Sequence, residues 1–166
     1  MTRFHAPLSP RLATDDTFAP FGALIADAGQ PGRTYIDVAT QGLSDGVKQR
    51  LWTIHRDPAP GDVQLTELER HPLSPQSFMP LGNATLLVAV ATSLPDGSPD
   101  PAGLSLFVVP PGCGVCYRRG VWHHGLITLD APCGFAVLMG CVSAAEDTET
   151  HPLDVPVTIP RDILKV

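Results

Sequence analysis

Two carboxylates and an imidazole share one face of a predicted strand. Read as a strand, the segment VQLTELERH alternates with period two, so that one face carries Val63, Leu65, Glu67, Glu69 and His71. If the aliphatic residues point into a core, the ionisable ones point inward with them. Burying an ionisable group is costly unless it is paired, hydrogen-bonded or bound to a ligand. This face is therefore the first candidate for chemistry.

A second group of candidate side chains lies in residues 117–129, YRRGVWHHGLITL. Strand alternation places His123 on the opposite face from Trp122 and His124, so one of the two histidines should point inward. We favour His123 as the inward one. Histidine is the side chain best suited to change charge or bind a metal near neutral pH.

The spacing of these residues is similar to the two metal-binding motifs of cupins. Glu69-x-His71 followed by Gln76 matches the first motif, and residues 111–123 match the second. Position by position, the usual two histidines, glutamate and final histidine become Glu69, His71, Gln76 and His123. The charge pattern is altered, but their oxygen and nitrogen atoms are suitable metal ligands.

The elements that must position these residues are short apolar segments separated by proline and glycine. Only residues 14–19 predict a helical turn, capped by Thr14. Residues 147–151 predict a polar linker. The expected strands cover residues 22–26, 33–38, 48–56, 63–71, 76–80, 84–91, 104–109, 114–117, 121–129 and 135–142, with an edge strand at 155–159. This pattern predicts an all-β sandwich or barrel, as a single domain over residues 1–166.

Composition narrows the class of protein. The chain has 166 residues, of which 43% are hydrophobic and 17% charged, which excludes a disordered chain. Its net charge of −6 argues against a nucleic-acid partner. No apolar run reaches the roughly 18–20 residues that span a bilayer, so we expect no membrane partner. The N-terminal segment lacks the apolar core of a signal peptide, and we expect a cytoplasmic protein.

The four cysteines fit that compartment as reduced thiols. Cys113 and Cys116 form a C-x-x-C, but no second ligand pair accompanies it. A zinc site at this motif is therefore not expected.

Several segments of the chain resemble the ureidoglycolate lyase family. They are ELERHPL at residues 67–73, QSFMPL at 76–81, Tyr117-x-x-x-Val-Trp-His-His-x-Leu126 and FAPFG at 18–22. The resemblance implies a cupin-like β-barrel, or double-stranded β-sandwich, with little helix, and a homodimer. It also implies a carbon–nitrogen lyase of the amidine-lyase type that cleaves ureidoglycolate to glyoxylate and urea in allantoin (purine) breakdown. The family is described as using, or being stimulated by, a divalent metal such as nickel. Gly125 departs from the proline that commonly follows the two histidines.

Cleavage of ureidoglycolate requires removal of the hydroxyl proton, protonation of the departing urea nitrogen and a grip on the carboxylate. We expect His71 or His123 to be the base, with Glu69 orienting the imidazole. Tyr117 would move a proton or orient the urea. The expected substrate-binding residues are Arg56, as a bidentate carboxylate clamp, with Gln76, His124 and Trp122. If a metal binds, its expected ligands are Glu69, His71, Gln76 and His123.

Other interpretations stay open at this point. Arg56 is equally suited to a surface ion pair, and Trp122 is more typical of packing than of substrate contact. Glu67 and Arg70 fit rim charges. The function classes that compete with the lyase are another small-acid cupin enzyme, such as an isomerase or amidohydrolase, and a non-catalytic sensor of glyoxylate-like acids.

Overall fold

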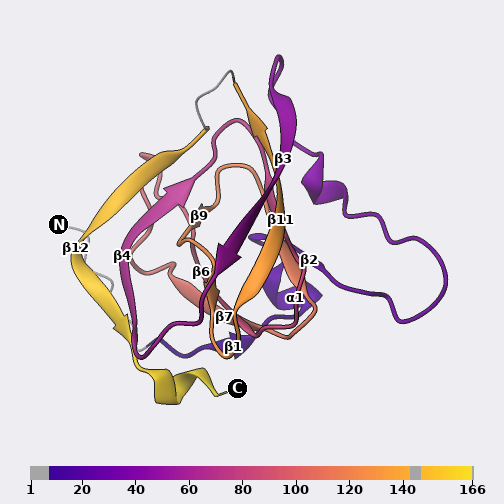
Figure 1. The fold of residues 1–166 in the computed structure, drawn as a ribbon. Helices are drawn as coiled ribbons and strands as arrows, with labels where there is room; N and C mark the ends of the chain where they lie inside the picture. The colour runs from indigo at the N-terminus through magenta and orange to yellow at the C-terminus, as the bar shows by residue number, and fades with distance from the viewer. Residues whose placement is uncertain (1–7, 143–146, 166) are drawn as a thin grey trace.

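The computed structural model describes residues 8–142 and 147–165. These residues form twelve strands, one short α-helix and two 3-10 helices (Figure 1). The helices are α1 (Asp15–Phe18), η1 (Asp37–Ala39) and η2 (Arg161–Leu164). The strands are β1 (Arg11–Leu12), β2 (Gly22–Ile25), β3 (Lys48–Arg56), β4 (Val63–Arg70), β5 (Gln76–Pro80), β6 (Leu86–Ala91), β7 (Ser105–Val109), β8 (Gly114–Tyr117), β9 (Trp122–His123), β10 (Ile127–Thr128), β11 (Cys133–Cys141) and β12 (Glu149–Ile159). No helix among them is long and apolar enough to cross a membrane.

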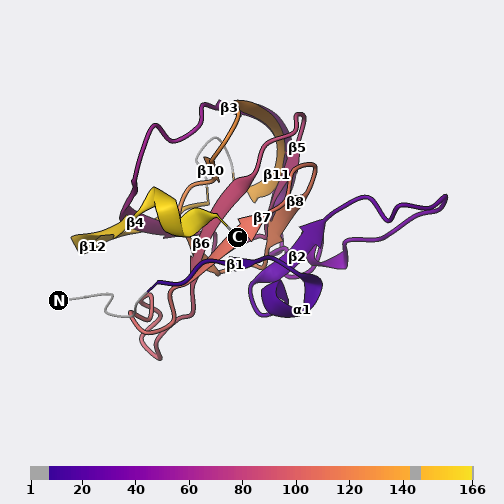
Figure 2. The ribbon, with the colours of Figure 1, turned by 90° about the horizontal axis from the view of Figure 1, so that it is seen from below.

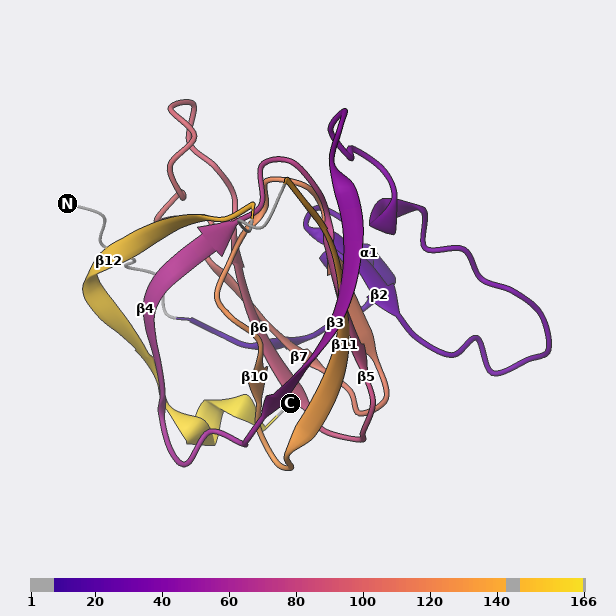
Figure 3. The ribbon, with the colours of Figure 1, turned by 45° about the horizontal axis from the view of Figure 1, so that its top comes forward.

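The strands form two sheets, which confirms the predicted all-β, cupin-like class. The seven-stranded sheet has the order β1-β7-β6-β9-β4-β12, with β10 also paired to β6. The five-stranded sheet has the order β2-β8-β5-β11-β3. Figures 2 and 3 show the five-stranded sheet on one side of β6 and β7, and β4 with β12 on the other.

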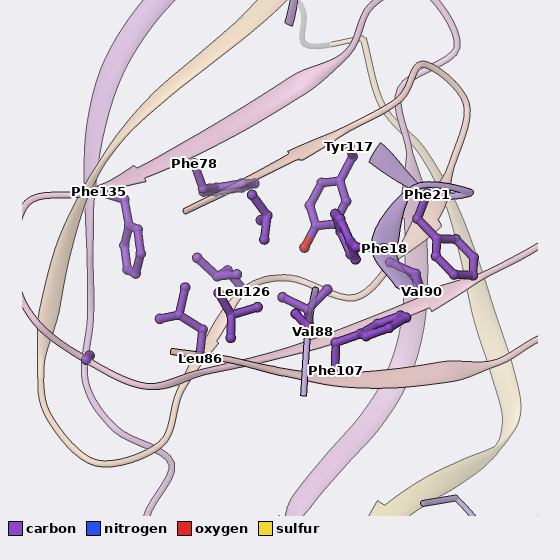
Figure 4. Close-up of a cluster of buried hydrophobic side chains, with 14 of the residues drawn as sticks. Phe18, Phe21, Phe78, Leu86, Val88, Val90, Phe107, Tyr117, Leu126 and Phe135 are labelled. Carbon is purple, nitrogen blue, oxygen red and sulfur yellow. The ribbon is translucent and has the colours of Figure 1, made fainter. Parts of the chain in front are cut away.

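The main core lies between the two sheets. Strand β6 is apolar on both faces, as its sequence predicts, and it contributes Leu86, Val88 and Val90 to this core. Figure 4 shows these aliphatic residues beside the rings of Phe107 and Tyr117. The alternate residues of β6 pack into a second cluster with side chains of β4 and β12, and η2 adds Leu164 to it. Burial on both sides makes β6 the central strand on which the other elements pack.

The inner face of the five-stranded sheet consists of cross-strand rows. Directly paired residues on neighbouring strands point to the same face. One row runs through Leu24, Val115, Phe78, Val137 and Trp52, and all of these side chains belong to or pack against the core between the sheets. The next row runs through Gly22, Tyr117, Gln76, Met139 and Arg50. We call this second set the Gln76 row. It lies where the apolar interior gives way to polar side chains.

Several sequence-based predictions are confirmed. Helix α1 begins at Asp15 after an N-cap at Thr14, whose side chain accepts a hydrogen bond from the Thr17 amide at 3.2 Å. Strand β3 has the predicted bounds, and the predicted edge strand at 155–159 forms the end of β12.

Other predictions about elements are wrong. Residues 33–38 form no strand, because the Pro31-Gly32 turn leads into an exposed segment that projects from the body (Figure 1) and ends at η1. Residues 147–151 are not a linker, since β12 begins at Glu149 and pairs with β4. The predicted strand 121–129 is divided into β9 and β10, which both pair with β6.

The predicted alternation of β4 is also wrong in its middle. Val63, Leu65 and Leu68 all pack into the second cluster, while Glu67 is exposed. The alternation therefore changes phase between Leu65 and Leu68. Pairing with β12 is irregular at this point, with a register shift between Pro152 and Val157, and such irregularities bend a strand and redirect its side chains.

Candidate active site

Four polar side chains from three strands and a strand end meet at one end of the space between the sheets. Glu69 of β4 and His123 of β9 are direct cross-strand partners. The Nε2 atom of His123 lies 3.5 Å from Oε1 of Glu69 and 3.2 Å from Oε1 of Gln76 on β5. The ring of His71, just after β4, lies 5.2 Å from that of His123 between centroids. His71, Gln76 and His123 are buried, and the side chain of Glu69 is 32% exposed.

Backbone carbonyls determine which nitrogen of each histidine faces the site. Nδ1 of His71 donates to the carbonyl of Asp147 at 2.6 Å, and Nδ1 of His123 donates to the carbonyl of Val121 at 2.9 Å. In a neutral ring the other nitrogen then carries the lone pair. Both histidines therefore present Nε2 to the site, and Nε2 of His71 is buried without a hydrogen-bond partner.

Nε2 of His123 faces two oxygen atoms. The carboxylate of Glu69 can only accept a hydrogen bond, and Gln76 presents its amide oxygen because its Nε2 lies 3.4 Å from Sδ of Met139. A lone pair that faces two acceptors is unfavourable. A proton on His123, or a cation bound between these atoms, removes the conflict.

The same atoms fit a divalent metal ion. One ligand atom from each of Glu69, His71 and His123 lies within 4.8 Å of the other two, and Oε1 of Gln76 lies beside them. Two imidazole nitrogens with a carboxylate oxygen suit nickel, zinc, iron and copper. The unpartnered Nε2 of His71 is the observation that favours this fit, since metal-bound histidines commonly donate Nδ1–H to a backbone carbonyl as His71 does.

Local electrostatics lowers the pKa of both Glu69 and His71, which leaves one a carboxylate and the other a neutral imidazole. The hydrogen bond from His123, with the nearby charges of His123, His71 and His124, lowers the pKa of Glu69 despite its partial burial. Glu69 is therefore a carboxylate at neutral pH. Burial, followed by repulsion from His123, lowers the pKa of His71. His71 is therefore a neutral base at the same pH.

Tyr117 supports the site from the core side. Its ring stacks on that of His123, with centroids 4.1 Å apart and planes at 18°. Its hydroxyl points into the apolar cluster shown in Figure 4 and has no hydrogen-bond partner. Burial, and to a lesser extent Glu69, raises the pKa of Tyr117 far above neutrality. This placement favours a role in positioning His123 over the predicted proton transfer.

Two of the predicted substrate-binding residues lie away from this group. Arg56 is on the inner face of β3, but it pairs with Cys133, six residues along the strand from Arg50 in the Gln76 row. That separation corresponds to about 20 Å. Trp122 points to the opposite face of β9, into the second cluster, where the Arg70 guanidinium lies 4.6 Å from its ring. The structure therefore favours the packing interpretation of Trp122.

His124, the neighbour of His123 in the sequence, does not point inward with it. It is half-buried, its backbone amide donates to Ala89, and its Nδ1 contacts the Gly125 carbonyl at 2.8 Å. It is close enough to Glu69 to lower the pKa of that carboxyl. Between the two adjacent histidines, His123 is the one that points inward.

Asp147 is a site residue that sequence reasoning missed. Its backbone carbonyl accepts from His71, and its buried carboxylate accepts from the Leu73 amide at 2.6 Å. These two bonds hold the His71 side chain and the backbone two residues after it. Strand patterns carry no signal for such a contact, because it joins residues 76 positions apart through a backbone atom.

Comparisons with known proteins all identify similarity to one family. The family model described as ureidoglycolate lyase matches residues 5–160. A putative ureidoglycolate lyase of Agrobacterium fabrum is 31% identical, covering 92% of this chain and 94% of its own length. A ureidoglycolate lyase of Burkholderia mallei is 36% identical over 79% of this chain and 81% of its own length. One from Schizosaccharomyces pombe is 29% identical over 70% and 75% respectively.

Proposed function

The chain belongs to the ureidoglycolate lyase family, and we propose that it cleaves ureidoglycolate to glyoxylate and urea. The reacting carbon of this substrate carries a hydroxyl, a carboxylate and a urea nitrogen. Loss of the hydroxyl proton lets the oxygen form a carbonyl while the C–N bond breaks. The electron pair of that bond goes to nitrogen, which takes up a proton to give urea. The reaction therefore needs a base and an acid on one small molecule.

The observation that carries the proposal is the contrast between the two buried histidines. Nε2 of His71 has no partner and its pKa is lowered, so we assign it as the base for the hydroxyl proton. Nε2 of His123 lies 3.5 Å from Oε1 of the Glu69 carboxylate, and we assign His123 as the acid for the urea nitrogen. Together the two histidines form the acid–base pair that the reaction needs.

The remaining side chains hold this pair. Glu69 lies against Nε2 of His123, and the Tyr117 ring stacks on the imidazole and fixes its plane. Gln76 is placed to hydrogen-bond the substrate's urea carbonyl or carboxylate. A divalent metal held by Glu69, His71, His123 and Gln76 would supply Lewis-acid polarisation of substrate oxygens.

The test is to mix the purified protein with ureidoglycolate and to measure glyoxylate, urea and ammonia, with and without a chelator. Equal amounts of glyoxylate and urea, without ammonia, are the expected products. Ammonia release would instead identify an amidohydrolase. Binding of glyoxylate without any turnover would identify a sensor.

The proposal also includes a homodimer. Strand β3 pairs with β11 on one side only among the described strands, and Leu51 in its middle is 67% exposed. An apolar side chain on a nine-residue edge strand favours contact with a second chain. Light scattering during size-exclusion chromatography measures the mass, with a dimer as the expected result.

We further propose that the chain acts in the cytoplasm, as one domain, without a nucleic-acid partner. Within the described residues no cysteine forms a disulfide, which is typical of a reducing compartment. The shared core between the two sheets supports one domain, and the net charge of −6 disfavours nucleic acid.

A further inference from the structure

A carboxylate substrate beside Glu69 calls for a cation that the acid–base pair does not provide. The arginines closest in sequence to the site residues are already bound elsewhere. Arg70 pairs with Glu149, Arg118 donates to the Ala19 carbonyl, and Arg119 donates to the carbonyls of Pro72 and Gly42. Arg56 lies at the end of β3 that is far from the site, so the cation has to be a different residue.

The Gln76 row brings Arg50 to the site end of the five-stranded sheet. Gln76 pairs with Met139 on β11, and Met139 pairs with Arg50 on β3. The three side chains therefore point to the same inner face. Two interstrand spacings separate the backbones of Gln76 and Arg50 by about 10 Å. A small carboxylate held at Gln76 lies within reach of an extended arginine side chain.

The surroundings of Arg50 leave its guanidinium available. Arg50 is exposed, and none of the described residues forms an ion pair or side-chain hydrogen bond with it. Lys48 lies on the same face two residues before Arg50, at the start of β3, where it pairs with Cys141. With Gly46, Gln49 and Cys141, both basic residues line an open cavity of about 440 Å³ at the start of β3. Two cations on one concave surface attract an anion.

We propose that Arg50, assisted by Lys48, binds the carboxylate of the substrate. This inference rests on the proposed function for the identity of the substrate. A guanidinium binds a carboxylate with two parallel hydrogen bonds, which orients the ligand as well as attracting it. Arg50 then places the carboxylate away from Glu69 and leaves the hydroxyl and the urea nitrogen to the histidines.

The test compares Arg50→Gln and Lys48→Gln with Arg56→Gln, which alters the same strand and face at the opposite end. Loss of a charged hydrogen bond predicts that R50Q raises KM for ureidoglycolate about 10- to 100-fold, with kcat nearly unchanged. K48Q has a smaller effect, R50K keeps the charge but loses the paired hydrogen bonds and so recovers only part of the affinity, and R56Q behaves as wild type. Thermal unfolding midpoints check that all variants fold.

Calorimetric titration with glyoxylate provides a readout that does not depend on turnover. R50Q weakens glyoxylate binding by a similar factor, and R56Q does not. Wild-type protein could fail to cleave ureidoglycolate but still bind glyoxylate, with R50Q binding it more weakly. That result would overturn the proposed function and support the anion site at Arg50. An R50Q variant with wild-type KM and wild-type glyoxylate affinity overturns the inference, as does a wild-type protein that binds no glyoxylate.

Discussion

Glu69 and His123 face each other directly across β4 and β9, and Oε1 of the carboxylate lies 3.5 Å from Nε2 of the imidazole. Strand β9 has only two residues and pairs with both β4 and β6. Through β9, the contact therefore connects β4, which carries Glu69, to the central strand β6. Several consequences of this contact and its neighbours can be measured.

Replacing Glu69 with glutamine removes the carboxylate that lies 3.5 Å from Nε2 of His123, the proposed acid. We expect kcat to fall about 10²- to 10⁴-fold, the range for loss of a general acid. Glu67→Gln is the matched control, because Glu67 is an exposed carboxylate two positions away on the same strand. Steady-state kinetics with ureidoglycolate measures both variants. Equal activity in E69Q and E67Q would remove Glu69 from the mechanism.

Two substitutions at Tyr117 distinguish a role in positioning His123 from a role in proton transfer. Tyr117→Phe keeps the stacked ring and removes a hydroxyl that has no partner, so activity should stay within about threefold of wild type and stability should not fall. Tyr117→Leu loses the stacking, and we expect a lower kcat and a loss of about 1–3 kcal/mol in the free energy of unfolding. Denaturant unfolding and kinetics test both variants. Inactivity of Y117F with an intact fold would assign the proton transfer to the hydroxyl after all.

Asp147 should matter although it lies outside the cupin motifs. Asp147→Ala removes the acceptor for the Leu73 amide beside His71 and leaves that donor unpaired. We expect the free energy of unfolding to fall by about 1–3 kcal/mol and kcat to fall with it as His71 loses its position. Asp45→Ala, at an exposed loop position, is the control and should change neither quantity. A D147A variant with wild-type kcat would limit Asp147 to a structural role.

The lowered pKa of His71 predicts how stability depends on pH in the metal-free protein. The unfolded chain takes up a proton near the ordinary value of 6.5, whereas the folded chain does so at lower pH. Between these two values the unfolded state binds more protons, so stability is fully present above 6.5 and is lost as the pH falls through the folded pKa. Denaturant unfolding as a function of pH measures this slope.

The same shift predicts the acid limb of the activity profile. A base with a lowered pKa keeps kcat/KM high to below pH 6.5 before it falls. His71→Asn should abolish turnover and also flatten the slope of stability in this window. His55→Asn is the control, because His55 is an exposed histidine with a surface partner, Asp57. A slope that persists unchanged in H71N would assign it to another group.

Metal binding can be tested separately from turnover. Nickel titrated into metal-free protein should bind one ion per chain, and H123N and E69Q should weaken that affinity at least about tenfold. H55N should leave it unchanged. Calorimetry measures the affinity, and bound metal is counted by elemental analysis. Equal nickel binding in all variants would exclude these ligands.

The sequence alone predicted much of the fold and most of the candidate site residues. Alternation and proline–glycine punctuation were enough to predict the all-β class, the bounds of β3 and the doubly buried β6. The motif spacing selected Glu69, His71, Gln76 and His123, which the fold does bring together. The predictions of single elements succeed because they depend on local periodicity, whereas the four site residues lie on different elements and were selected by motif spacing.

Only the tertiary structure decided which residues stand opposite one another. Arg56 and Arg50 lie on the same face of one strand, and nothing local distinguishes them, but the register of β3 against β11 places Arg50 in the row of Gln76. The same holds for Asp147 beside His71 and for Leu68, whose face changed where β4 pairs irregularly with β12. Period-two alternation states which face a residue occupies, whereas register and bulges depend on partner strands far away in the sequence.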